Sequence, residues 1–125
     1  MKEVTAGIDI GGIDTEIGLV GENGKCYNKS VIITSNFSNV RTFIKECVDI
    51  INQLSSKENL KVNAVGIAAP NGNPYKGTIE NAVNLRWKGV IPFVEIMKEL
   101  IDANSVGKRL PVTLTKDAKA AAVGE

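Results

Sequence analysis

The chain has 125 residues, of which 43% are hydrophobic and 23% are charged. This length and composition allow one domain with a hydrophobic core and exclude a disordered chain. Fifteen basic and 14 acidic residues leave a net charge of +1, and no basic run is present, so nucleic-acid binding is not expected. No apolar run approaches the roughly 20 residues that span a bilayer, and the amino terminus does not resemble a signal peptide. The sequence therefore predicts a cytoplasmic protein that binds no membrane.

The chain has few residues suited to metal binding or redox chemistry. Histidine is absent, which removes the commonest general base and metal ligand. The two cysteines, Cys26 and Cys47, lie too far apart for a CxxC motif. We expect both to be small buried apolar groups, and the chain to hold no zinc site.

The first third of the chain predicts three strands, over residues 4–10, 16–20 and 25–34. Apolar and β-branched residues dominate these segments. The sequence GENG at 21–24 is typical of a hairpin turn. Three strands joined by short turns predict an antiparallel meander.

The middle of the chain changes from a strand period to a helix period. Apolar residues recur at three- and four-residue steps from Val40 to Leu54, which predicts one buried stripe on a helix. Ser38 or Asn39 is placed to cap its amino end. Residues 62–68 then form a nearly continuous apolar stretch, as expected for a strand covered on both faces.

The last part of the chain begins with an irregular segment. Two prolines and a glycine predict irregular structure for residues 69–76. Residues 78–85 have the composition of a short extended ribbon. Pro92 suits the first turn of a helix. Residues 111–115 predict a further strand, and residues 117–123 the start of another helix.

The order of these elements, βββαβαβα, predicts the fold class. An antiparallel meander followed by α/β crossovers is the arrangement of the ribonuclease-H-like domain found in actin and in sugar kinases. Doubly wound folds begin with βαβ instead. We therefore expect a mixed five-stranded sheet with flanking helices, formed by residues 1–125 as a single domain.

The first candidate for chemistry is the sequence GIDIGGIDT at 7–15. Gly11 and Gly12 allow a sharp turn and a close approach to a bulky anion. The exposed amides, with the Thr15 hydroxyl, are suited to phosphate oxygens, and Asp9 is placed to engage Mg²⁺ directly or through water. A plain glycine-rich hairpin with a solvated aspartate is the alternative. A P-loop is excluded because the GKS/T ending is missing.

The second candidate is Asp117, which follows the last predicted strand and opens a helix. Its carboxylate is suited either to capping the helix amides or to acting as general base for a substrate hydroxyl in phosphoryl transfer. Both interpretations remain open at this stage.

The third candidate is the segment that follows the central strand. It contains APNGN at 69–73, GTI at 77–79 and NLRW at 84–87. Asparagines and glycines in such a segment suit hydrogen bonding to a polyol, although the same residues favour plain turns. Trp87 is suited to stacking on a sugar or to anchoring the loop.

All three segments occur in the order found in sugar kinases of the ROK family. Residues 7–20 resemble the family's phosphate motif, DxGGTxxK. The sequence VGIAAPN at 65–71 is similar to GIGAPG, and the GTI and NLRW segments are similar to its G-x-I and NLxW. Residues 110–125, LPVTLTKDAKAAAVGE, resemble LPVxxxNDANAAAxGE. The resemblance covers nearly the whole chain, and its PNGN loop is closest to the family's glucokinases.

The resemblance implies roles for single residues in an ATP- and Mg²⁺-dependent hexose kinase. Asp117 would be the catalytic base that takes the proton of the sugar hydroxyl. The ATP phosphates would be bound by Gly11, Gly12 and Thr15, and Mg²⁺ would be bound through water by Asp9. The sugar would be bound by Asn71, Gly72 and Lys116.

Four positions depart from the family pattern. Lys116 replaces the asparagine that binds sugar hydroxyls, and Lys119 replaces the next asparagine. Ile13 replaces a threonine and Glu16 replaces a lysine, which puts a negative charge near the expected phosphates. A lysine beside the catalytic aspartate weakens its basicity or obstructs the sugar. Together these changes predict impaired catalysis.

The family continues into a second lobe, which carries further sugar ligands, a zinc site and the adenosine pocket. Such kinases react in the cleft between two lobes. We expect this chain to be the amino-terminal lobe with the second lobe absent, and to be inactive alone. The alternative is a half-domain that self-associates as a homodimer through the open interface. A fragment of a ROK-type transcriptional regulator is a further alternative.

Overall fold

A computed structural model describes residues 2–104 and 109–116. The described elements are strands and helices in a mixed α/β order. They are β1 (Lys2–Ile10), β2 (Asp14–Gly21), β3 (Cys26–Ile33), the 3-10 turn η1 (Thr34–Asn36), α1 (Val40–Lys57), β4 (Leu60–Ala68), β5 (Gly72–Asn73), β6 (Thr78–Glu80), β7 (Val90–Ile91), α2 (Phe93–Ala103) and β8 (Val112–Thr115). The helix predicted over 117–123 lies outside the described residues.

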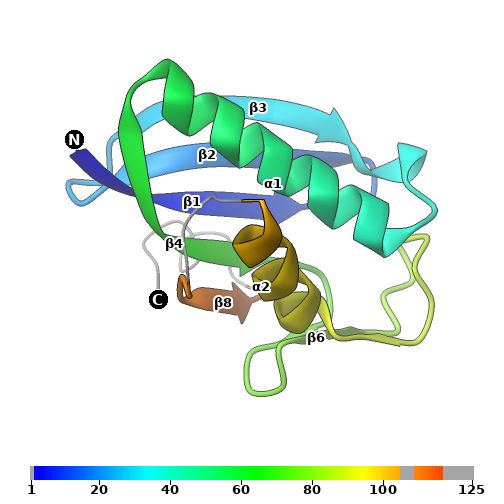
Figure 1. The fold of residues 1–125 in the computed structure, drawn as a ribbon. Helices are drawn as coiled ribbons and strands as arrows, with labels where there is room; N and C mark the ends of the chain where they lie inside the picture. The colour runs from blue at the N-terminus through cyan, green and yellow to red at the C-terminus, as the bar shows by residue number, and fades with distance from the viewer. Residues whose placement is uncertain (1, 105–108, 117–125) are drawn as a thin grey trace.

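The main sheet has five strands in the order β3-β2-β1-β4-β8. β1, β2 and β3 pair antiparallel as a meander, whereas β4 pairs parallel with β1, and β8 parallel with β4. Figure 1 shows β1 and β4 side by side in the middle of this sheet, pointing the same way. The predicted mixed five-stranded sheet is confirmed.

The hairpin between β2 and β3 follows the predicted turn. Gly24 adopts a φ of 82°, a left-handed conformation in which glycine lacks the strain of other residues. Its amide donates to the Gly21 carbonyl at 2.9 Å. The two strands are thereby held antiparallel over the length of the meander.

Both described helices cover the same face of the sheet (Figure 1). Asn39 caps α1 by accepting from the amides of Arg41 and Thr42 through Oδ1, as one of the two predicted caps. α1 is amphipathic and buries its apolar stripe, including Phe43 and Ile51, on the sheet. In the described part of the chain, neither helix has the length and apolar character needed to cross a membrane.

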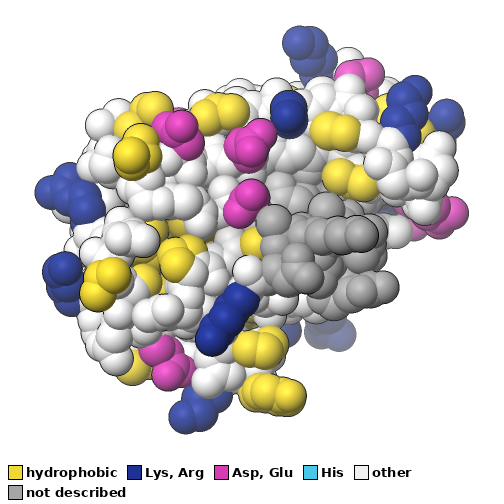
Figure 2. All heavy atoms as spheres, turned by 180° about the vertical axis from the view of Figure 1, so that it is seen from behind, with side chains coloured by type: hydrophobic (Ala, Val, Ile, Leu, Met, Phe, Trp, Pro, Cys, Tyr) yellow, Lys and Arg dark blue, Asp and Glu magenta, His cyan; other side chains and the backbone are white. Residues whose placement is uncertain are grey.

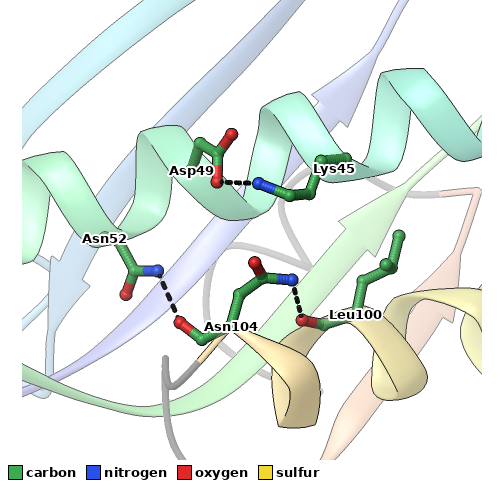
Figure 3. Close-up of polar contacts among 5 residues, drawn as sticks. All are labelled: Lys45, Asp49, Asn52, Leu100 and Asn104. Atoms are coloured by element: carbon green, nitrogen blue, oxygen red, sulfur yellow. Dashed lines mark hydrogen bonds and ion pairs between the residues drawn. The ribbon is translucent and has the colours of Figure 1, made fainter.

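The two helices are also joined by a polar contact (Figure 3). Asn52 of α1 donates to the backbone carbonyl of Asn104 at 3.1 Å, and the Asn104 side chain donates to the Leu100 carbonyl at 2.7 Å. Asn104 therefore satisfies a carbonyl at the end of α2 and ties that end to α1. Lys45 and Asp49 pair on the exposed side of α1 at 2.6 Å.

Four aromatic rings form the end of the core nearest the glycine turn. Phe43 lies 4.7 Å from Trp87, 5.6 Å from Phe37 and 6.4 Å from Phe93, centroid to centroid. Trp87 is 4% exposed, and its indole N–H donates to the Phe37 carbonyl at 3.0 Å. Of the two interpretations of Trp87, the structure favours the buried loop anchor.

The segment between β4 and α2 has more order than the sequence predicts. β5, β6 and β7 form a small antiparallel sheet inside the stretch that begins with the predicted irregular loop. The predicted ribbon over 78–85 is extended only as far as Glu80. Short strands of two or three residues leave too weak a period to be read from sequence.

The prediction that both cysteines are buried is confirmed for Cys47 and wrong for Cys26, which is exposed. Cys47 lies on the inner face of α1, where burial raises the pKa of its thiol far above the ordinary value. Cys26 lies at the start of β3, an edge strand of the main sheet. Its exposure follows from the edge position, which sequence alone does not reveal.

Replacing Phe43 by alanine tests the aromatic cluster. We expect Phe43→Ala to lower the free energy of unfolding by about 3–5 kcal/mol, because it leaves a cavity among three other rings. Urea unfolding followed by fluorescence measures the change. Glu46→Ala on the exposed side of the same helix is the control, and we expect it to change stability by less than about 0.5 kcal/mol. Equal losses in both variants would contradict the packing described here.

Candidate functional site

The candidate site lies at the end of the sheet formed by the carboxyl ends of β1, β4 and β8. These strands are parallel, and Asp9 pairs with Ala68, which in turn pairs with Thr115. Two strand spacings of about 4.8 Å put Asp9 and Thr115 about 10 Å apart. The glycine turn and the loop after β4 therefore begin at the same end of the sheet, beside the end of β8.

The glycine turn begins at this edge, and packing alone requires glycine at two of its positions. A Cβ on Gly11 would lie 2.7 Å from the Asp14 carbonyl oxygen, and one on Gly12 would lie 2.8 Å from the Asn84 carbonyl oxygen. The Gly11 amide also donates to the Asp14 carbonyl at 2.9 Å. Gly11 therefore closes the turn, and Gly12 lets the loop around Asn84 approach it.

The face of the sheet opposite the helices carries carboxylates beside this turn. Asp9 is exposed and lies directly across from Glu16 in the β1–β2 pairing. Glu16 contacts Lys29 of β3 at 3.4 Å, with both side chains more than half exposed. Figure 2 shows acidic side chains gathered on this face. Among the described residues, no group of three potential ligands is close enough to hold a metal ion without other help.

Thr15 does not occupy the position predicted for it. Its side chain is 0% exposed, and its hydroxyl lies 2.6 Å from the hydroxyl of Thr34. Alternation along β2 puts Thr15 on the helix-covered face, whereas its neighbours Asp14 and Glu16 are exposed. The hydroxyl in this structure joins β2 to the turn after β3, and the predicted contact with phosphate oxygens does not fit this geometry.

The loop after β4 is pressed against the end of β8. A Cβ on Gly72 would lie 3.2 Å from the Ala69 carbonyl and 3.4 Å from the Thr115 carbonyl, and the Ala69 amide donates to Thr115 at 2.9 Å. Asn71 has a φ of 57°, a left-handed conformation that asparagine tolerates better than most residues. These contacts hold the loop next to the segment that leads to Asp117.

Asn71 uses its side-chain amide to hold the loop together. Its Nδ2 donates to the backbone carbonyls of Glu80 and Asn81 at 2.9 and 3.1 Å. Both protons of that nitrogen are engaged in this way. The carbonyl oxygen of the side chain is the atom that can accept from a hydroxyl group of a ligand.

An open pocket of about 390 Å³ lies between this loop and the end of β8. Three residues predicted to bind the sugar line this pocket together, and Asn73 belongs to the same predicted segment, whereas the sequence did not single out Pro74, Tyr75 and Glu80. The lining residues are Asn71, Gly72, Asn73, Pro74, Tyr75, Glu80 and Lys116. Asp117, the predicted base, lies outside the described residues.

Glu80 contributes a carboxylate to this pocket that the sequence analysis did not single out. Its Oε2 accepts from the Thr78 hydroxyl at 2.6 Å and from Asn73 Nδ2 at 3.2 Å. Chiefly the Thr78 hydrogen bond, with that of Asn73 and the charges of Lys76 and Lys116, lowers the pKa of Glu80. The signal in the sequence was the T-x-E spacing on one face of a strand, which became readable only once β6 was known.

Replacing Thr15 separates a structural role from a phosphate contact. We expect Thr15→Val to cost about 1–3 kcal/mol of stability, because it leaves the Thr34 hydroxyl buried without this partner. The double variant Thr15→Val/Thr34→Val is expected to recover part of the loss, since both polar groups are then removed. Chemical denaturation measures both variants. Full stability in Thr15→Val would contradict the structural role.

The depressed pKa of Glu80 predicts how the pocket responds to acid. The ionised carboxylate stabilises the loop fully above the ordinary glutamate pKa of about 4.3, and this contribution is lost as the pH falls through the lower folded pKa. The side-chain amide resonance of Asn73, followed by NMR from pH 7 to pH 2, should shift with a midpoint below that ordinary value. Glu80→Gln should abolish the shift. A midpoint at or above the ordinary value would contradict the hydrogen bonds described here.

Comparison with known proteins agrees with this geometry. The family model described as "ROK family" matches residues 5–125. A glucokinase of Streptomyces coelicolor is 35% identical over 127 aligned positions, which cover 98% of this chain and 35% of that protein. A ROK family glucokinase of Streptomyces griseus, solved with glucose and AMPPNP, is 25% identical with a TM-score of 0.68 and covers 98% of this chain and 37% of its own.

A ROK hexokinase of Thermus thermophilus is 19% identical and shares the fold, with a TM-score of 0.71 over 89% of this chain and 34% of its own. The chain thus spans about a third of the length of the relatives it matches. The family match over nearly the whole chain agrees with the strand order of the sheet. The protein belongs to the ROK family.

Proposed function

We propose that this chain is the amino-terminal lobe of an ATP-dependent hexose kinase, which converts glucose and ATP to glucose 6-phosphate and ADP, and that it does not turn over alone. The observation that supports the proposal is the row formed by Asp9, Ala68 and Thr115, because it brings the glycine turn, the loop after β4 and the end of β8 to one end of the sheet. The glucokinase relatives support the substrate and the nucleotide.

In the proposed reaction, the sugar hydroxyl oxygen attacks the γ-phosphorus of ATP, and the bond from that phosphorus to the β–γ bridging oxygen breaks. Asp117 accepts the hydroxyl proton, and ADP leaves. Asn71, Gly72 and Lys116 line the sugar side of the pocket. Phosphoryl transfer depends mainly on positioning and charge stabilisation, so the first lobe alone supplies only part of what the reaction needs.

The amides of the glycine turn are the proposed phosphate contacts. Since the Gly11 amide is engaged by the Asp14 carbonyl, we assign the contact to the amides of Gly12 and Ile13. Backbone amides in such a turn form an anion-binding concavity. Gly11 then serves the site by shaping the turn.

Mg²⁺ fits the carboxylates found beside the turn. The ion is usually held by one or two carboxylates together with substrate phosphates and waters, and Asp9 and Glu16 lie directly opposite each other on the exposed face. Bound there, Mg²⁺ would offset the negative charge of the nucleotide. The same carboxylates would repel ATP that carries no metal ion, which makes nucleotide binding depend on the ion.

NMR titration of the uniformly ¹⁵N-labelled chain tests the proposal. We expect Mg-ATP to shift amide resonances over residues 9–16, and glucose to shift those over 71–73 and 80. Glu16→Lys restores the charge usual in the family and removes one of the two carboxylates proposed for Mg²⁺. It is therefore expected to tighten the binding of ATP without the metal roughly tenfold, because two units of charge change beside the phosphates.

Glu22→Lys is the matched control, because it makes the same charge change in the hairpin turn at the opposite end of β2. Equal tightening in both variants would show a general charge effect. No shift at either segment would contradict the proposed function. A coupled assay for glucose 6-phosphate should detect no turnover by the chain alone. Turnover that is abolished by Asp117→Ala would contradict the proposal that the lobe is inactive by itself.

Self-association of the chain as a homodimer stays a prediction. Val31 and Ile33 are 53% and 43% exposed on the edge strand β3, and Ile13 beside them is 72% exposed. Analytical ultracentrifugation of the same labelled sample at micromolar concentration measures its oligomeric state. A strict monomer would contradict the homodimer and leave the kinase proposal standing.

A further inference from the structure

Tyr75 is the most exposed large hydrophobic residue of the described chain, at 97%. It lies at the tip of the β5–β6 hairpin and borders the pocket that holds Asn71, Glu80 and Lys116. It also borders a second hollow of about 390 Å³ against β8. An aromatic ring in solvent gains nothing from the core, so its position is not explained by folding.

The turn that carries Tyr75 is held firmly. Asn73 Oδ1 accepts from the amides of Tyr75 and Lys76 at 3.0 and 3.1 Å, and the Gly77 amide donates to the Asn73 carbonyl at 2.8 Å. Asn73 thus makes four hydrogen bonds, three within the turn and one from Nδ2 to Glu80 of β6. The backbone bearing the exposed ring is therefore ordered before any ligand arrives.

Gly77 fixes the same turn to α2. Its φ is 69°, and a Cβ there would lie 2.9 Å from the Cβ of Val94, while its carbonyl accepts from the Val94 amide at 3.0 Å. The hairpin thus rests on the first turn of α2. A rigid element beneath an exposed aromatic side chain lowers the entropy lost on binding.

The pocket beside the ring offers polar groups to the rim of a sugar. Glu80 uses Oε2 for Thr78 and Asn73, so Oε1 can accept from a hydroxyl. The Asn71 side-chain oxygen is a second acceptor, and the Lys116 ammonium is a donor. A pyranose has hydroxyl groups around its rim and C–H groups on its faces. Only an aromatic or apolar surface complements those faces, and Tyr75 is the aromatic residue that borders this pocket.

We infer that Tyr75 is a sugar-binding residue, whose ring stacks on one face of a pyranose while Asn71, Glu80 and Lys116 bind its hydroxyl groups. This inference rests on the proposed function and names Tyr75 as a residue that determines sugar specificity. The ring selects a cyclic hexose over an open-chain polyol with a similar number of hydroxyl groups, because the open chain has no flat apolar face to stack.

Affinity measurements on the chain with glucose and sorbitol test this inference. We expect Tyr75→Ala to weaken glucose binding roughly five- to tenfold, the size of a lost aromatic contact, and to leave sorbitol binding unchanged. Tyr75→Phe and Tyr75→Trp should retain glucose affinity, since the ring and not the phenol hydroxyl makes the contact. Saturation-transfer NMR should carry magnetisation from the tyrosine ring protons to the C–H protons of glucose.

Val90→Ala is the control, because Val90 is exposed on β7 of the same small sheet and is absent from the pocket lining. Thermal unfolding of Tyr75→Ala should match that of the unmodified chain, since the ring is in solvent. Glucose shifts over 71–73 with unchanged affinity in Tyr75→Ala would overturn this inference and leave the proposed function intact. No glucose shift in any variant would overturn both.

Discussion

The in-register parallel pairing of β1, β4 and β8 is the constraint on which the rest of the structure depends. It aligns Asp9, Ala68 and Thr115 at one end of the sheet, although Asp9 and Thr115 are separated by more than a hundred positions along the chain. A shift of one residue in either ladder would reverse which side chains face the helices. The buried side chains of Ile8, Ile67 and Leu114 therefore hold the site in place from the opposite face of the sheet.

The loops at this edge are held by close backbone contacts rather than by charge. Gly12 meets Asn84, Gly72 meets the end of β8, and Gly77 meets Val94. At Gly12 and Gly77 a Cβ would obstruct the second segment, and at Gly72 it would be tightly packed against it. The ion pairs of the described residues are exposed and contribute little stability. Shape positions the glycine turn and the loop after β4, and the carboxylates on the open face then set the charge beside the turn.

The charge pattern makes this member of the ROK family depart from the usual phosphate site. Glu16 stands where the family has a lysine and lies across from Asp9, with Lys29 of the next strand as its ion-pair partner. The cation is thus displaced by one strand. In the proposed function, Mg²⁺ between the nucleotide and the carboxylates would neutralise phosphate charge that a lysine would otherwise help to neutralise. Nucleotide binding would therefore depend more strongly on the metal.

Much of the fold follows from local sequence. The apolar runs that form β1 and β2, the glycine hairpin and the Asn39 cap each depend on neighbouring residues, and the structure confirms them. The same local signals located the glycine turn and the loop around Asn71. Tertiary structure alone decided the rest, because burial depends on which segments meet. Strand alternation turned Thr15 inward to Thr34, the edge position of β3 exposed Cys26, and a small sheet with two-residue strands brought Glu80 and Tyr75 into one pocket.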